Sequence, residues 1–129
     1  AKAFKALTEI PKEFRTKEIE DKIKEMTEYF LIHHLYKKSH NLSEVSKQGW
    51  LKLGFPLMYN TDILELLGIF NKLGIKDERL YDAIEIIKQK EADGKWILEN
   101  TFNGKMQVQI EKKGEPSKWI TMMATRILL

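Results

Sequence analysis

The sequence predicts an all-α protein built from inner and outer helices, with one short β-hairpin in a long loop. In five segments, apolar residues recur at the 3.6-residue period of an α-helix. These segments alternate along the chain between apolar on nearly every side and apolar on one face, which is the pattern of buried and surface helices. The length of 129 residues, with 43% hydrophobic and 32% charged residues, fits one domain with a hydrophobic core.

Three of the predicted helices belong to the inner layer. Residues 62–73 carry leucine, isoleucine and phenylalanine on all sides, and residues 118–128 repeat this pattern with tryptophan, methionine and isoleucine. Residues 3–9 form a shorter version of the same kind of helix. Thr61 is expected to cap the helix 62–73 and Gly74 to end it.

The two outer helices are expected at residues 17–37, behind the cap Thr16, and at residues 78–89. In each, one apolar stripe lies opposite charged side chains. The charged links that lead into these two helices also resemble each other in sequence. This internal similarity favours a repeat architecture over a closed bundle.

Two long connections separate the helices. In the first, a single helical turn is expected at residues 42–46. The second contains Asn103-Gly104, the dipeptide best suited to a two-residue hairpin turn. Residues with alternating character flank this turn, so we predict a short hairpin between residues 97–101 and 106–110.

A further motif combines Gln89, Gly94 and Trp96. Gln89 lies near the end of an outer helix, Gly94 allows a bend at low steric cost, and Trp96 returns beside the helix end. An amide of Gln89 packed on the indole of Trp96 would clamp one helical unit to the next. The alternative is an ordinary helix C-terminus followed by a buried tryptophan.

This Gln-x-x-x-x-Gly-x-Trp pattern resembles the repeat motif of the terpenoid cyclase and prenyltransferase superfamily, of the squalene-hopene cyclase type. Residues 53–126, with the runs 54–59, 94–100 and 116–121, look like the C-terminal part of prokaryotic prenyltransferase or squalene-oxidase-repeat proteins of uncharacterised function. The resemblance implies an α/α toroid, and residues 1–129 would be a single domain formed by its C-terminal portion. The Asp-x-Asp-Asp run of the triterpene cyclases and the cysteine ligand of the zinc prenyltransferases are both missing. Neither activity therefore carries over to this chain.

Five aromatic residues lie near the loops: Trp50, Phe55, Tyr59, Phe102 and Trp119. All but Phe102 are taken as candidates for ligand binding. In a toroid, their rings would line an apolar cavity for an isoprenoid, and their faces would stabilise cationic carbon centres. The alternative is that these rings belong to the hydrophobic core.

Two polar residues are further candidates. Asp62 stands at a helix N-terminus, so it either caps the helix or lies at the mouth of a cavity beside Tyr59. His34, next to His33, would suit metal binding or proton transfer, but adjacent histidines point in different directions on a helix, which favours a structural role. We expect no metal site.

The expected function is binding of an isoprenoid-like or lipid-like ligand, or of a protein partner, without catalysis in this segment. The alternative is part of a terpenoid cyclase-like or prenyltransferase-like enzyme whose catalytic residues lie upstream, and the chain itself offers no assigned catalytic residue. No cofactor is expected. The 22 basic and 19 acidic residues are interspersed, so a nucleic-acid partner is not expected.

Composition also bears on location and assembly. No apolar run approaches the roughly 20 residues that a membrane span requires. The chain has no cysteine, which excludes disulfides and thiolate zinc sites and fits a cytoplasmic location. The apolar faces of the first and last helices, Phe4 with Leu7 and Trp119 with Met123 and Ile127, are expected to be exposed. They would either join copies of the chain into a homo-oligomer or leave this segment less stable than a longer toroid.

Overall fold

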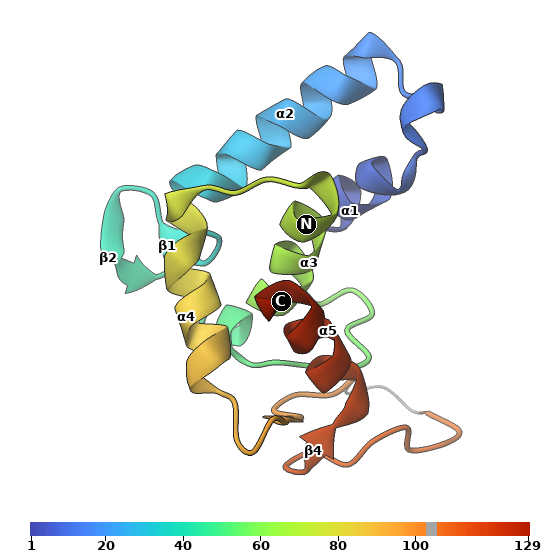
Figure 1. The fold of residues 1–129 in the computed structure, drawn as a ribbon, viewed down its shortest axis with the longest axis vertical. Helices are drawn as coiled ribbons and strands as arrows, with labels where there is room; N and C mark the ends of the chain where they lie inside the picture. The colour runs from blue at the N-terminus through green and yellow to red at the C-terminus, as the bar shows by residue number, and fades with distance from the viewer. Residues whose placement is uncertain (103–105) are drawn as a thin grey trace.

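The computed structural model describes residues 1–102 and 106–129. The described residues are mostly helical, as predicted (Figure 1). The α-helices are α1 (Lys2–Glu9), α2 (Lys17–Ile32), α3 (Ile63–Leu73), α4 (Tyr81–Gln89) and α5 (Lys118–Leu128). Short 3-10 helices are η1 (Lys12–Phe14), η2 (Gln48–Leu51) and η3 (Glu78–Leu80), and the strands are β1 (Lys37–Lys38), β2 (Asn41–Val45), β3 (Trp96–Ile97) and β4 (Pro116–Ser117).

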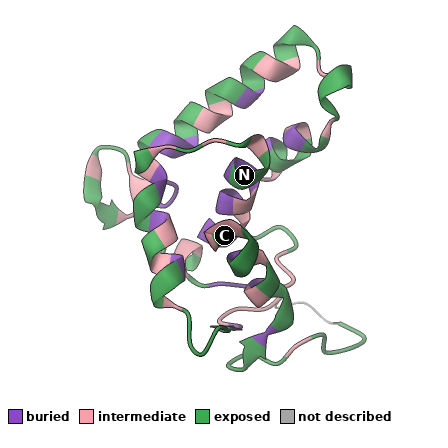
Figure 2. Ribbon diagram, in the orientation of Figure 1, coloured by how far each residue is buried: buried purple, intermediate pink, exposed green. Residues whose placement is uncertain are grey.

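Helix α3 forms the centre of the fold. Its apolar side chains are buried on nearly all sides, as predicted, and it contacts α1, α4 and α5 (Figure 2). It ends at Gly74, whose φ of 70° lies in the left-handed region that glycine adopts without strain. The N-cap is Asp62 rather than the predicted Thr61, because a carboxylate oxygen of Asp62 accepts the backbone N–H of Glu65 at 2.9 Å.

Helix α1 packs against α2 and α3 through Phe4. The ring of Phe4 stacks on Phe30 at a centroid distance of 5.4 Å and meets Phe70 edge-on at 5.8 Å. Phe4 is only 1% exposed. The prediction of an exposed Phe4 face is therefore wrong, because α2 and α3 cover it. Leu7 is half-buried and packs against the same core.

Helix α2 ends at Ile32, short of its predicted end. The N–H of His34 bonds to the carbonyl oxygen of Leu31, and the N–H of Leu35 bonds to that of Phe30, both at 2.9 Å. This is the hydrogen-bond pattern of a Schellman motif, in which one residue adopts a left-handed conformation. Here His34 takes that position, with φ of 45°, and Leu35 after it is also left-handed, with φ of 69°. Glycine usually occupies this position, so the sequence contained no signal for the helix end.

A small antiparallel strand pair follows α2. Strand β1 pairs with β2, and Lys37 lies opposite Val45. The side-chain oxygen of Asn41 accepts both the backbone N–H and the hydroxyl of Ser43. The predicted helical turn at residues 42–46 is therefore wrong. A side chain that bonds to the backbone locally competes with helix formation, and here it holds a strand.

The second strand pair joins the loop after α4 to the entry of α5. In this antiparallel pair, Trp96 lies opposite Ser117. The backbone N–H of Leu98 extends the pairing to the carbonyl oxygen of Glu115 at 2.9 Å. The entry of α5 is thus fixed by the chain that leaves α4.

The predicted hairpin between residues 97–101 and 106–110 is wrong, because β3 pairs with β4 and not with residues 106–110. The described residues 106–110 contain no strand, and the predicted turn residues Asn103 and Gly104 lie outside the described part of the chain. Strand β3 contacts α5, so burial of Trp96 against that helix, rather than the local turn signal, selects its partner strand.

Helices α4 and α5 each bury one face. In α4, Ala83 and Ile87 face the core, as its one-sided stripe predicts. The composition of α5 predicts burial on all sides, but Ile120 and Ala124 alone are buried among its described residues. Trp119 is 46% exposed. The neighbours of α5 explain the difference, because they come from α3, α4, β3 and β4 and cover one face.

The helix contacts follow a simple order. Helices α1, α3 and α5 form a row, with α2 against α1 and α4 against α3 (Figure 1). The expected inner layer is reproduced only at α3, which is buried on nearly all sides; among the described residues, α1 buries only Phe4 and Thr8, and α5 only Ile120 and Ala124. The closed α/α toroid, and the place of this chain within one, remain predictions.

Candidate functional site

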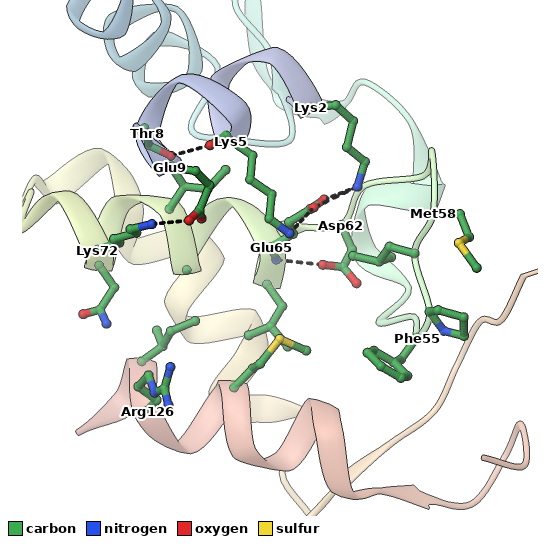
Figure 3. Close-up of a pocket in the computed structure, with 18 residues that line it drawn as sticks. Lys2, Lys5, Thr8, Glu9, Phe55, Met58, Asp62, Glu65, Lys72 and Arg126 are labelled. Carbon is green, nitrogen blue, oxygen red and sulfur yellow. Dashed lines mark hydrogen bonds and ion pairs between the residues drawn. The ribbon is translucent and has the colours of Figure 1, made fainter. Parts of the chain in front are cut away.

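A cleft of about 700 Å³ lies between α1, α3, α5 and the loop of residues 55–58 (Figure 3). Its volume falls within the range of small-molecule sites. We call it the α1–α3–α5 cleft. Its apolar wall is formed by Phe55, Pro56, Leu57, Met58, Leu64, Ile69, Met123 and Ile127.

Gly68 keeps this cleft open in the middle of α3. It lines the cleft, and a Cβ atom built on it would meet no heavy atom within 4 Å. A glycine inside a helix costs about 1 kcal/mol relative to alanine. The missing side chain leaves space that belongs to the cleft.

Charged side chains from α1 and α3 form one rim. The Nζ atoms of Lys2 and Lys5 lie 2.8 and 3.3 Å from Oε1 of Glu65. The Nζ atom of Lys72 lies 2.7 Å from a carboxylate oxygen of Glu9. These ion pairs tie α1 to α3 and compensate most of the charge on that rim (Figure 3).

Arg126 adds a positive charge from α5, across the cleft from α1 (Figure 3). Its side chain makes no ion pair or hydrogen bond within residues 1–102 and 106–129. A guanidinium presents N–H groups in a fork that matches a carboxylate or a phosphate. Arg126 is therefore the cationic group of the cleft best placed to receive an anion.

Asp62 lies in the wall of the cleft and is 2% exposed. Its two carboxylate oxygens accept the backbone N–H groups of Gly54 and Glu65, each at 2.9 Å. Burial raises the pKa of Asp62 to about 6, and the two N–H groups oppose this shift. The predicted capping role of Asp62 is confirmed. Tyr59, predicted beside it, is 74% exposed and lines another hollow.

The aromatic candidates do not form one cavity. Phe55 lines the α1–α3–α5 cleft and stacks on Trp119 at a centroid distance of 5.1 Å and an interplanar angle of 13°. Trp50 and Tyr59 instead line a second hollow of about 560 Å³ next to η2. Leu57 lines both spaces, which therefore adjoin each other.

His34 lies elsewhere, facing α4. Its Nδ1 atom is 3.2 Å from Oδ2 of Asp82, and Nζ of Lys37 lies 2.5 Å from the same oxygen. The hydrogen bond from Lys37, followed by that of His34, lowers the pKa of the Asp82 carboxyl. His34 thus has a hydrogen-bond partner in the fold. Across the residues that the structure describes, no three His, Asp or Glu side chains gather as a metal site would require.

The motif at the end of α4 is held by Trp96. Its buried indole N–H donates a hydrogen bond of 2.7 Å to the carbonyl oxygen of Ile87. Gln89 is exposed, and its amide makes no hydrogen bond to a described residue. Gly94 has φ of 72°, as the predicted bend requires. The polar link to the helix end therefore comes from the indole and not from the glutamine.

Sequence reasoning missed the charged rim of the cleft. Lys2 and Glu65 are 63 positions apart, so no local pattern connects them, and Arg126 looks like an ordinary solvent-facing residue. One signal was available: Gly68 interrupts an otherwise apolar helix, and a glycine in that position commonly has a packing or functional reason.

Comparison of the chain with protein-family models, with curated proteins and with solved structures found no match. None of the described helices combines the length and the apolar character needed to cross a membrane. The geometry of the cleft is therefore the basis on which a function can be proposed.

Proposed function

We propose that the chain binds an elongated apolar molecule with an anionic head group, such as an isoprenyl phosphate or a fatty acid, in the α1–α3–α5 cleft. The observation that carries this proposal is the apolar wall combined with Arg126 at the rim. Burial of an apolar chain contributes about 25 cal/mol per Å². The guanidinium of Arg126 would pair with the head group and fix the direction in which the chain lies.

A binding role is favoured over a catalytic one because the acids of the cleft already have partners. Both oxygens of Asp62 accept backbone N–H groups, and Glu65 is held by Lys2 and Lys5. A general acid or base needs a lone pair or proton directed at the ligand. In this arrangement the carboxylates hold the protein together, and the ligand contacts the apolar wall.

The first test fills the cleft from within. Palmitate and farnesyl diphosphate are titrated into the chain and followed by calorimetry, and Gly68→Leu is compared with the unsubstituted protein. A Cβ atom at this position has open space around it, and the leucine side chain would extend into the ligand space, so binding of both ligands should weaken at least about tenfold. Gly49→Leu is the control, because Gly49 also has open space around it and lies outside this cleft.

The second test removes the cation. Arg126→Gln should weaken the binding of farnesyl diphosphate by about tenfold, the equivalent of one charge-assisted hydrogen bond. It should leave the affinity for the alcohol farnesol unchanged. Lys95→Gln, on the loop after α4, is the control. The proposal is wrong if Gly68→Leu leaves all affinities unchanged, or if Arg126→Gln weakens farnesol as much as its diphosphate.

A further inference from the structure

The second hollow, next to η2, differs in chemistry from the α1–α3–α5 cleft. Its volume is about 560 Å³, and its wall is mainly polar and aromatic. We call it the basic hollow and define it by Lys47, Trp50, Lys52, Tyr59, Asn60 and Asn100.

The charge of the basic hollow is one-sided. Lys47, Lys52 and Lys2 line it, and no aspartate or glutamate is among its described lining residues. Lys2 is compensated by Glu65. Lys47 and Lys52 make no side-chain ion pair or hydrogen bond to any residue that the structure describes. Two uncompensated ammonium groups in one concave surface attract an anion.

Two aromatic side chains stand beside these lysines. Trp50 is half-buried and packs against the hydrophobic core, which limits the freedom of its indole. Tyr59 is mostly exposed, and its ring meets Phe102 edge-on at 6.1 Å. Aromatic side chains of this kind are surfaces on which a planar base stacks, whatever the base.

Amide groups complete the wall. Asn100 is fixed by its backbone, because its N–H donates to the carbonyl oxygen of Leu53 at 3.0 Å and its carbonyl accepts the N–H of Phe55 at 3.3 Å. Its side-chain oxygen accepts the N–H of Thr101 at 3.1 Å. Among the described residues, the NH₂ group of Asn100 and the amide of Asn60 have no hydrogen-bond partner. Such amides pair with the edges of nucleobases.

We propose that the basic hollow binds a small anion that carries a planar heterocycle, a nucleoside phosphate being the chemical class that uses all of its groups. Lys47 and Lys52 contact the phosphate, the ring stacks on Trp50 or Tyr59, and the asparagine amides bond to the edge of the base. This site is separate from the cleft, where the lipid-like ligand is proposed to bind. Its existence does not depend on that proposal.

Calorimetric titration of the full chain with ADP tests the site, with adenosine and inorganic pyrophosphate as the two halves of the probe. ADP should bind saturably and at least about tenfold more tightly than either half, since only ADP engages both the lysines and the aromatic rings. Pyrophosphate binding as tightly as ADP would exclude ring recognition, and adenosine binding as tightly would exclude phosphate recognition. Either result, or no saturable binding of ADP at millimolar concentration, overturns the proposal.

Variants assign the binding to this hollow. The double variant Lys47→Gln with Lys52→Gln should weaken ADP binding at least about tenfold. Tyr59→Leu should do the same if the base stacks on the ring of Tyr59. Trp50→Leu is made in parallel, and its folding is checked by circular dichroism because Trp50 packs on the core. The matched control is Lys88→Gln with Lys95→Gln, two exposed lysines outside the hollow. The proposal fails if the control and the test pair lose affinity equally, or if both aromatic variants bind ADP like the unsubstituted chain.

The two sites are distinguished by the variants of the cleft. Gly68→Leu should weaken binding of farnesyl diphosphate at least about tenfold and leave ADP binding unchanged. Loss of ADP binding in Gly68→Leu would place ADP in the cleft and overturn the assignment to the basic hollow. Retention of ADP binding without any binding of apolar ligands would overturn the proposed function alone.

Discussion

The indole nitrogen of Trp96 donates a hydrogen bond of 2.7 Å to the carbonyl oxygen of Ile87, a residue with no exposed surface. The backbone N–H of Trp96 also donates to the hydroxyl of Thr121 at 3.1 Å. One residue therefore ties the last turn of α4 to helix α5. A carbonyl near a helix end needs such a partner when water cannot reach it.

Trp96→Ala should lower the free energy of unfolding by about 3 kcal/mol, because it removes a large buried side chain. Trp96→Phe keeps much of the apolar volume but removes the indole hydrogen bond, so the Ile87 carbonyl keeps only the Lys90 N–H at 3.2 Å; the loss should be about 0.5–1.5 kcal/mol. Urea unfolding measures both. Gln89→Ala is the control and should change stability by less than about 0.5 kcal/mol. Equal stability of Trp96→Ala and the unsubstituted chain would show that the tie is not structural.

Asp62→Asn should change how stability depends on pH. The pKa of Asp62 is raised from 3.8 to about 6 in the folded chain, so the folded state holds the proton more tightly than the unfolded state does. Stability therefore decreases as pH rises from about 4 to about 6, by a contribution on the order of 3 kcal/mol. Because an asparagine amide does not titrate in this range, the substitution removes this contribution.

The measurement for Asp62 compares urea unfolding of the two proteins at pH 4, 5, 6 and 7. The stability of the unsubstituted chain relative to Asp62→Asn should fall across this range. Asp77 does not disturb the comparison, because hydrogen bonds from Arg79 lower its pKa to about 2 and its contribution is common to both proteins. Parallel stability curves would contradict the prediction.

Two glycine substitutions should have opposite signs. A Cβ on Gly54 would lie 3.2 Å from Leu57 Cδ2 and 3.3 Å from the backbone oxygen of Asn100, and a backbone atom cannot easily move away. Gly54→Ala should therefore destabilise the chain by about 1–3 kcal/mol. Gly68→Ala has open space and should stabilise it by about 1 kcal/mol through helix propensity. Thermal unfolding of the two variants measures the change in melting temperature. A higher melting temperature for both would contradict the packing described at Gly54, and a lower one for both would contradict the open space described at Gly68.

Phe4→Ala should be among the most costly substitutions in the chain, with a loss of about 3–5 kcal/mol, because Phe4 joins α1 to both α2 and α3. Phe14→Ala is a matched control, since Phe14 is 70% exposed. It should change the unfolding free energy by less than about 0.5 kcal/mol. Chemical denaturation of both variants gives the comparison. Similar losses for the two would show that α1 is not docked as described.

The helices themselves were predictable because their signals are local. The all-round apolar character of residues 62–73, the cap Thr16 and the stop at Gly74 each depend on a few neighbouring residues. The end of α2 was not predictable, because the left-handed position belongs to His34 and not to a glycine. The signal there comes from hydrogen bonds that only the folded backbone shows.

The candidate site was predictable only in part. Asp62 and Phe55 were identified from their position near a loop and a helix end, and both line the cleft. The ion pair of Lys2 with Glu65 and the approach of Arg126 depend on how α1 and α5 pack on α3, which no local pattern specifies. Trp50 and Tyr59 line a different hollow from Phe55 for the same reason, because the packing of distant segments decides which space each ring lines.

Lys2 and Leu57 line both the cleft and the basic hollow, so occupants of the two sites would share neighbours. Thermodynamic linkage then applies: any factor by which one occupant changes the affinity for the other must hold equally in reverse. Whether one occupant strengthens or weakens binding of the other depends on Lys2. An anion that draws Lys2 away from Glu65 towards one site removes its charge from the other, so anionic occupants of the two spaces would compete through a single lysine without touching each other.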